Sequence, residues 1–432
     1  MMRFVFVAVM MLAALPARAG VEIKEVTTPG GINVWLVEEP SIPFVALEIR
    51  FRGGASLDVE GKRGATNLMV GLLEEGAGDL DSQGFAKATE ALAAQFSYDA
   101  SDDAISVSAR FLTENRREAL ELLRLSLIEP TFDDVSLNRV RGQVLAGIRS
   151  SEKDPNDIAS RNFDALAFGD HPYSTALEGT VQSVSGLTRQ DIVDAHANAL
   201  ARDRLYVSAV GDITEAELGV LLDDLLGALP QTGAPLPERA DLTLSGGTTV
   251  IDFDIPQSVA LFGHVGMERD DDDFFAAYLL NTILGGGGFE SRLMEEVRVK
   301  RGLTYGVYSY LVPKDLAALY LGSVSSANDR IAEAVEVIRS EWARTASEGV
   351  SEEELSKAKA LLTGAYPLRF DGNGSIARIM VGMQMEDLGV DYIATRNDQL
   401  NAVTLEDVNR VAGELLQPEA LQFVVVGKPQ GL

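Results

Sequence analysis

The chain has 432 residues and a formal net charge of −28, because 65 acidic side chains outnumber 37 basic ones. A negative field of this size repels nucleic acid and anionic membrane surfaces, so neither is an expected partner. Hydrophobic residues make up 46% of the sequence, enough for the cores of two or three domains. The sequence contains no cysteine, which excludes disulfides, a cysteine nucleophile and lipid attachment through a cysteine.

Residues 1–19 have the composition of a secretory signal peptide. The cationic residue Arg3 precedes an apolar run at 4–15, and the small residues Ala17 and Ala19 mark a cleavage site. The apolar run is short for a permanent membrane anchor, so we expect cleavage after Ala19 and export. An uncleaved N-terminal anchor is the alternative. Export of a chain without cysteine favours a bacterial periplasm, and no later segment has the composition of a transmembrane span.

The rest of the chain is predicted to be a tandem duplication of a module of roughly 200 residues. The segments that begin at Glu114, Val135 and Leu187 each match a later segment, and the three matches occur in the same order. In the last of them, Thr188 matches Thr404 at an offset of 216 residues (404 − 188). Ordered matches at nearly constant offset are hard to obtain by chance, so we interpret them as a repeat.

Each module combines strand and helix patterns. Alternating apolar and polar residues early in each module predict strands that pair as neighbours, followed by helices and a closing strand. This order predicts an α+β fold with a mixed or antiparallel sheet packed against helices. The predicted N-terminal domain spans 20–228 and the predicted C-terminal domain spans 248–432. Residues 229–247 contain three prolines and no periodicity, as expected of a linker.

Four consecutive glycines, Gly285, Gly286, Gly287 and Gly288, lie between two segments with helical patterns. Glycine is costly in conformational entropy, so the run indicates either a flexible turn or a close approach of a ligand to the backbone. A phosphate-binding loop is a poor alternative, because no Gly-Lys-Ser/Thr follows and no strand precedes the run.

Arg298 and Tyr305 are seven positions apart, where the second of these helical segments ends and a strand begins. A guanidinium offers forked donors for peptide carbonyls, and a phenol can donate to a developing oxyanion. Considered alone, such a pair is most often surface packing, so the residues by themselves leave both interpretations open.

The sequence resembles a known family along essentially its whole length after the signal peptide. The segments GGGGFESRLMEEVR, RGLTY and VTLEDV…VVVG resemble the second half-domain of the pitrilysin/insulinase-type zinc peptidases. The first module resembles the same family through RFRGGASLD, HPYSTALEGT and LTRQDI…VGD, and the likeness is greatest to small bacterial relatives of mitochondrial processing peptidase. The resemblance implies two half-domains that enclose a peptide-binding chamber. It also implies that Arg298 and Tyr305 bind substrate and stabilise the tetrahedral intermediate, with Gly285–Gly288 along the peptide path.

The resemblance also shows what the first module lacks. In catalytic members, the helix of the segment GATNLMVGLLEEG carries His-x-x-Glu-His, two zinc ligands and a general base. With Gly64 aligned, Asn67 stands for the first histidine, Val70 for the glutamate and Gly71 for the second histidine. Downstream, Ala146 and Gly147 stand where the third ligand would lie. Zinc catalysis needs three protein ligands and a water, so no metal or other cofactor is expected on this chain.

The three histidines elsewhere in the sequence do not repair the motif. No two of His171, His196 and His264 have the spacing of metal ligands on one helix, so each is expected to be a loop or packing residue.

The resemblance therefore implies a non-zinc subunit of a heterodimeric metallopeptidase that is inactive alone. A homologous partner would hold the zinc, its general base and the catalytic water, and an extended peptide would be the substrate. The alternative from another class is a non-catalytic peptide-binding or assembly protein, because members of the family also serve as structural subunits of membrane complexes. A stand-alone peptidase with a non-metal mechanism lacks both a cysteine and a Gly-x-Ser-x-Gly elbow.

Overall fold

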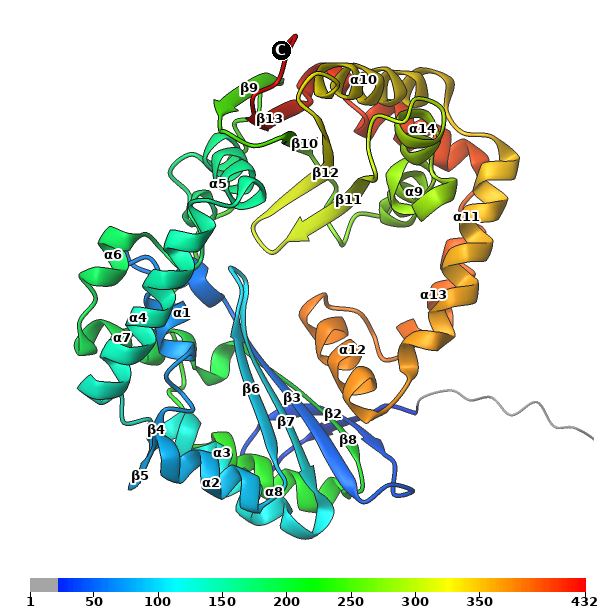
Figure 1. Ribbon diagram of the computed structural model, residues 1–432. Coiled ribbons are helices and arrows are strands. Elements are labelled where there is room, and N and C mark those ends of the chain that lie inside the picture. Colours follow the sequence, from blue (N-terminus) through cyan, green and yellow to red (C-terminus); the bar gives the residue numbers. More distant parts are fainter. Residues whose placement is uncertain (1–21) are drawn as a thin grey trace, which may run out of the picture.

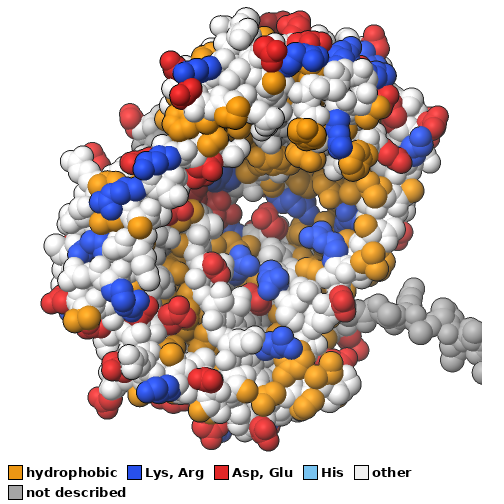
Figure 2. Space-filling view, viewed as in Figure 1, with side chains coloured by type: hydrophobic (Ala, Val, Ile, Leu, Met, Phe, Trp, Pro, Cys, Tyr) orange, Lys and Arg blue, Asp and Glu red, His pale blue; other side chains and the backbone are white. Residues whose placement is uncertain are grey.

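The computed structural model describes residues 22–432, so the expected signal peptide at 1–19 lies outside the described residues. The described chain forms two halves, each a sheet with helices, arranged around a central hollow (Figures 1 and 2). No helix within residues 22–432 is both long and apolar enough to cross a membrane.

The first half contains a six-stranded sheet in the order β1-β2-β8-β3-β7-β6. Its strands are β1 (Lys24–Thr27), β2 (Asn33–Glu38), β3 (Phe44–Arg52), β6 (Gln95–Ala100), β7 (Ala104–Leu112) and β8 (Leu205–Gly211). A separate ribbon is formed by β4 (Gly76–Ala77) and β5 (Leu80–Asp81). The helices of this half are α1 (Ala65–Val70), α2 (Ser82–Ala91), α3 (Arg116–Ile128), α4 (Asp134–Ser151), α5 (Pro155–Phe168), α6 (Val181–Ser185), α7 (Arg189–Ala199) and α8 (Glu215–Leu226).

The second half contains a five-stranded sheet in the order β11-β12-β10-β13-β9. Its strands are β9 (Gly247–Asp252), β10 (Gln257–Val265), β11 (Val307–Lys314), β12 (Ala317–Ala327) and β13 (Gln422–Gly427). Its helices are α9 (Phe274–Asn281), α10 (Ile331–Glu348), α11 (Glu352–Ala365), α12 (Asn373–Met385), α13 (Tyr392–Ala402) and α14 (Leu405–Leu415). Two π-helical segments, Thr282–Gly286 and Met294–Val299, lie between α9 and β11.

The two sheets have the same topology. The order β2-β8-β3-β7-β6 corresponds to β9-β13-β10-β12-β11, and β2/β8 and β9/β13 are both parallel pairs. Thr188 and Thr404 cap α7 and α14 with the same capping-box arrangement. Gly211 and Gly427 end the equivalent strands β8 and β13 with φ values of 147° and 150°, a region that glycine tolerates. The α+β fold and the tandem duplication predicted from the sequence are confirmed.

The two halves exchange one helix each (Figure 1). α5 packs on β10 and β13 of the second sheet, where Phe163 shares a core with Leu261 and Val424. α12 packs on β3 and β8 of the first sheet, where Ala377 and Met380 contact the core. Because α5 and α12 follow α4 and α11 at equivalent places in the duplicated order, the exchange is symmetrical. The halves are therefore interlocked through two hydrophobic cores.

The segment between the halves is packed against its surroundings. Residues 227–246 form no helix or strand between α8 and β9. The backbone N–H of Ala240 donates to the carbonyl oxygen of Leu316 at 2.9 Å, and that of Thr243 donates to Ala167 at 3.0 Å. The predicted linker thus contributes to the contact between α5 and the second sheet, while the domain limits at 228 and 248 remain predictions.

Candidate functional site

Helix α1 is shorter than the sequence pattern suggested. The apolar spacing extends to Gly76, yet the helix ends at Val70 and is followed by turns. Gly71 occupies the C-cap, where its low helix propensity favours termination. The position that aligns with the second zinc-binding histidine therefore lies at the end of the helix.

The three motif positions of α1 have different surroundings. Asn67 is half-buried and lines a cavity of about 270 Å³. Val70 is only 4% exposed and belongs to the core of the first half. A Cβ at Gly71 would lie 3.2 Å from the Cγ1 of Val140, so α4 restricts the space beside that position. Val70 therefore lacks room for a long polar side chain, whereas a side chain at the exposed Gly71 requires a small shift of Val140.

Two of the positions expected to hold zinc ligands line this cavity, but the side chains around it do not form a metal site. Gly147 lines the same cavity as Asn67, and a Cβ at Gly147 would meet no atom within 4 Å. The carboxylates Asp157, Asp164 and Glu178 also line it. Among the residues the structure describes, however, no three His, Cys, Asp or Glu side chains are placed to hold a metal ion. The residues present do not fit the zinc site of the catalytic members.

Asp164 has an altered proton affinity in this cavity. Burial raises the pKa of its carboxyl group from 3.8 to about 6, and the nearby carboxylate Asp102 acts in the same direction. The ammonium group of Lys314 acts in the opposite direction and is outweighed. The first half thus retains an acidic cavity in which one carboxyl group titrates just below neutral pH.

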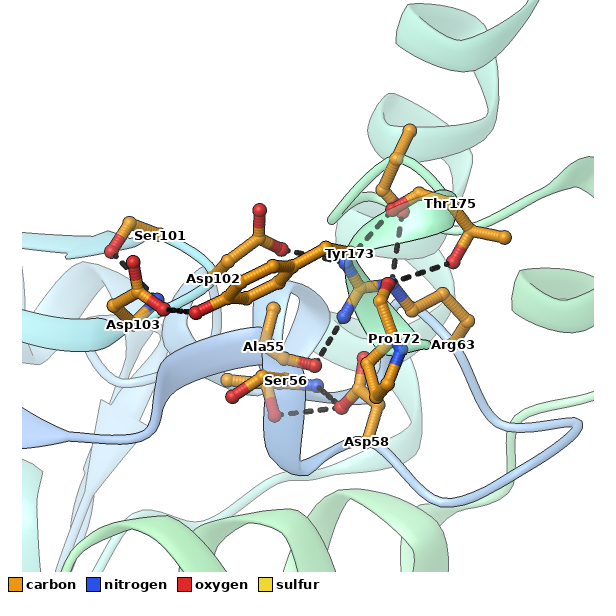
Figure 3. A network of polar contacts seen from close by, with 12 residues as sticks. Ala55, Ser56, Asp58, Arg63, Ser101, Asp102, Asp103, Pro172, Tyr173 and Thr175 are labelled. Carbon is orange, nitrogen blue, oxygen red and sulfur yellow. Dashed lines mark hydrogen bonds and ion pairs between the residues drawn. The ribbon is translucent and has the colours of Figure 1, made fainter. Parts of the chain in front are cut away.

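A polar network beside the cavity joins the two halves. Figure 3 shows its members from the first half, among them Arg63, Asp102, Asp103 and Tyr173. One carboxylate oxygen of Asp102, in the β6–β7 turn, accepts from Arg63 at 2.7 Å, and the other accepts from Lys314 at 2.7 Å. The hydroxyl of Tyr173 donates to Asp103 and accepts from the backbone N–H of Leu316 at 3.3 Å. The β6–β7 turn of the first sheet therefore binds the equivalent β11–β12 turn of the second.

The sequence contains only a partial signal for this network. Tyr173 lies in the family segment HPYS, which offered a local signal, but Asp103 is 70 residues away. Lys314 and Asp102 are separated by 212 residues, and no local pattern pairs them.

The glycine run is partly explained by packing. Gly285 is buried at the end of the first π-helical segment, and a Cβ there would clash with the hydroxyl of Ser309 on β11. Gly288 has a φ of 66° and open space around it, so its backbone conformation favours glycine. Gly286 is exposed. Close packing therefore accounts for Gly285, and a turn accounts for Gly288. The π-helical segment that contains Gly285 is of a kind that recurs at functional sites.

Arg298 and Tyr305 lie on either side of the connection between the second π-helical segment and β11. The guanidinium of Arg298 lies over the ring of the exposed Phe289, 4.6 Å from the ring centroid. Within residues 22–432, Arg298 forms neither an ion pair nor a side-chain hydrogen bond, and the Tyr305 hydroxyl forms no hydrogen bond. Tyr305 is 84% exposed and lies two residues before β11, an edge strand of the second sheet. Both polar groups are available to a ligand, and Phe289 is an additional member that the sequence did not indicate.

The histidines have structural roles, in accord with the expectation from sequence. Trp342 donates its indole N–H to the Nε2 of His264 at 2.9 Å, so the Nδ1 carries the proton and donates to Val265 O at 2.6 Å. Burial lowers the pKa of His264 to about 4, which keeps the ring neutral. The rings of His171 and His196 are likewise bonded to backbone carbonyl oxygens.

Together, a duplicated two-half fold and a first helix without metal ligands define a peptidase-like chain that lacks its own zinc chemistry. Residues 33–181 match the family model "Insulinase (Peptidase family M16)", and residues 186–362 match "Peptidase M16 inactive domain". The chain belongs to peptidase family M16, as an inactive member.

Relatives of similar length support this placement. The chain is similar to "Non-peptidase homolog YmxG" of Helicobacter pylori, with 27% identity over 90% of each chain. It is also similar to an uncharacterized zinc protease of Streptomyces coelicolor, with 26% identity over 91% of this chain and 87% of the relative. The crystal structure of a peptidase M16 inactive domain from Pseudomonas fluorescens has a TM-score of 0.88 and 29% identity, covering 95% of this chain and 98% of that one.

Proposed function

We propose that this chain is the exported, non-zinc subunit of a two-subunit metallopeptidase. It would act in the periplasm, bind an extended peptide, and present Arg298 and Tyr305 to a substrate held by a homologous zinc-bearing subunit. One observation carries the proposal: Tyr305 is 84% exposed and Arg298 has no carboxylate partner among the described residues, in a chain whose α1 has no metal ligands. Side chains with no structural partner are available for a substrate.

The chemistry assigned to this pair is binding and electrostatic stabilisation. Attack of water on a peptide carbonyl places negative charge on its oxygen, and the Tyr305 hydroxyl donates a hydrogen bond to that oxyanion. The guanidinium N–H groups of Arg298 donate to a neighbouring peptide carbonyl. Stacking on Phe289 orients the guanidinium before the substrate binds. The partner supplies the metal and the base, so this chain alone has no hydrolytic activity.

Peptide binding is supported by the two sheet edges. β6 pairs only with β7, and β11 pairs only with β12, so each leaves one edge of backbone N–H and C=O groups unpaired within the described sheets. An extended peptide can add to such an edge through main-chain hydrogen bonds, which provide affinity with little sequence preference. The exposed part of the glycine run, including Gly286, precedes β11 and lies along the proposed path.

A second candidate is a non-catalytic peptide-binding or assembly protein of the same fold. The Helicobacter pylori relative is named a non-peptidase homolog, which favours this function for at least some similar chains. The two candidates differ in one respect that can be tested: only the first requires Tyr305 to contribute to a reaction.

The test is a Tyr305→Phe variant in complex with the zinc-bearing partner. We expect the rate of peptide cleavage to fall by about 10²–10³-fold with peptide affinity retained, because one oxyanion donor is removed. Tyr308→Phe is the matched control, since Tyr308 is a second exposed tyrosine nearby, on β11, and should leave the rate unchanged. Equal rates for wild type and Tyr305→Phe would exclude the assigned role.

A further inference from the structure

A second cavity, with a volume of about 750 Å³, lies between α9, α12 and α13 in the wall of the central hollow. Four arginines line it, Arg269, Arg369, Arg378 and Arg396, and no aspartate or glutamate does. Its other lining residues include several aromatic rings. Figure 2 shows basic and hydrophobic side chains together on this side of the hollow. The whole chain has a net charge of −28, so a cavity lined by four cations and no anion differs in sign from the rest of the protein.

Arg396, on α13, is a buried cation without a carboxylate partner. It is 4% exposed, and its guanidinium lies 4.4 Å from the centroid of the Tyr366 ring. Its Nη1 donates to the carbonyl oxygen of Leu362 at 3.0 Å and to the Oδ1 of Asn397 at 2.9 Å. The Nε and Nη2 donors form no hydrogen bond with the described residues, and neither is fully enclosed by protein. A buried charge is costly unless it is compensated, and these two donors are available to an anionic ligand.

Arg269 also lines the cavity, where aromatic rings surround its guanidinium. Its guanidinium lies 4.5 Å from the centroid of Phe274 and 5.5 Å from that of Tyr392, and it donates to the Tyr392 hydroxyl at 2.9 Å. It forms no ion pair within the described part of the chain. Glu386 is close enough for Arg269 to lower its pKa, although burial is the larger effect and raises it. The aromatic rings and the Tyr392 hydroxyl thus orient the guanidinium of Arg269 without neutralising its charge.

Arg369 and Arg378 place two further charges at the entrance. Both are exposed, and Arg378 is 3.9 Å from Glu48, the one carboxylate within ion-pair distance of it among the described residues. Ser375, which also lines the cavity, lies in the first turn of α12, where unpaired backbone N–H groups add positive potential. The charged side chains that line the cavity are all cationic, so they attract an anion although Glu48 and Glu386 lie nearby.

We propose that this cavity is a binding site for the carboxylate groups of acidic peptides, with an apolar or aromatic side chain beside the carboxylate. This inference rests on the proposed function, because it names the class of peptide that the chain selects. Guanidinium groups match carboxylates through paired N–H donors, and the aromatic surfaces between them bind apolar side chains. The volume is within the range of sites that enclose a small ligand or a few residues of a chain.

The test compares peptides that differ only in charge. Three short peptides of equal length would alternate phenylalanine with glutamate, glutamine or lysine, each as a C-terminal acid and as an amide, and binding to the purified protein would be measured by calorimetry. We expect the glutamate peptide to bind at least about tenfold more tightly than the glutamine peptide. The acid and amide forms separate recognition of a terminal carboxylate from recognition of side chains.

Variants locate the effect in the cavity. Arg369→Gln combined with Arg378→Gln changes only exposed side chains, so the fold should persist and affinity for the glutamate peptide should fall about tenfold. Arg396→Met should remove the preference as well, with a thermal melt to check the fold. Arg330→Gln, a surface arginine paired with Glu333 outside the cavity, is the control and should leave affinity unchanged.

The outcomes separate this inference from the proposed function. If glutamate and glutamine peptides bind equally, or if the arginine variants bind the glutamate peptide like wild type, the cavity assignment is overturned while peptide binding stands. If wild-type protein binds none of the peptides, the proposed peptide-binding function and the cavity assignment both fail.

Discussion

Equivalent walls of the two halves have the same backbone plan and opposite charge. α1 and α9 follow the equivalent strands β3 and β10, and α5 and α12 are the exchanged helices of the repeat. The cavity beside α1 and α5 has three carboxylates and one arginine, Arg161, whereas the cavity beside α9 and α12 has four arginines and no carboxylate. The duplication therefore preserved the scaffold, and the chemistry diverged in the side chains.

Neither half has kept a complete catalytic site. The first half has the position of the zinc helix but Asn67, Val70 and Gly71 on it. In the second half, Arg298 and Tyr305 have no ion pair or side-chain hydrogen bond with the described residues. This comparison predicts that changes at Arg298 or Tyr305 impair the reaction, whereas changes at the zinc-helix positions of the first half affect stability.

Arg298→Gln should give the largest effect. In the complex with a zinc-bearing subunit, we expect cleavage to slow by about a hundredfold or more, because a fixed donor to the substrate is lost. Arg301→Gln is the matched control: Arg301 lies three positions away and is already paired with Glu296. Equal losses from both variants would mean that the effect is not specific to Arg298.

Val70→Glu should lower the free energy of unfolding by about 3 kcal/mol or more, because it places an unpaired carboxylate in the core of the first half. Gly147→Glu is the control at the other motif position, where a Cβ meets open space and glutamate is the better helix former. Chemical denaturation of both variants measures the difference. A harmless Val70→Glu substitution would show that the first half still has room for the catalytic glutamate.

Met380→Ala tests the exchange of helices between the halves. Met380 is fully buried between α12 and the first sheet, so its truncation should cost about 3 kcal/mol. Because the cores are shared, unfolding should remain one transition for both halves. Arg378→Ala, on the exposed side of the same helix, should change stability by less than about 0.5 kcal/mol. Two separate transitions in the wild type would contradict the interlocked arrangement.

Asp164→Asn should give the smallest change in the free energy of unfolding, and the size of this change should depend on pH. The folded-state pKa of Asp164 is raised to about 6 from 3.8, so the ionised form costs stability above pH 6, and this cost disappears as the pH falls towards 3.8. We expect Asn to stabilise the protein by about 1 kcal/mol at pH 7 and by nothing near pH 3.5. Asp157→Asn, an exposed carboxylate of the same cavity, is the control. A gain that is independent of pH would contradict the burial of Asp164.

Features encoded over short stretches of sequence were predictable. The repeat was visible because Thr188 and Thr404 begin equivalent helices, and the missing zinc ligands were visible because Asn67, Val70 and Gly71 fall within one helical frame. Arg298 and Tyr305 could be singled out for the same reason, although their role remains a prediction.

Features that depend on distant contacts were not predictable. Lys314 meets Asp102 across 212 residues, and α12 covers the first sheet although it lies in the second module. Arg396 has the sequence context of an ordinary surface residue on a helix, and only tertiary packing buries it at the arginine-lined cavity. Packing also explains Gly285, for which the sequence suggested only flexibility or ligand contact.

The most direct test of the central claim is to isolate the native protein from periplasmic extract, identify what co-purifies, and assay peptide cleavage with and without a zinc chelator. We predict a co-purifying homologue with His-x-x-Glu-His, and chelator-sensitive cleavage that neither subunit has alone. A protein that is isolated without such a homologue, from extracts in which the homologue is present, and that never supports cleavage would contradict the account.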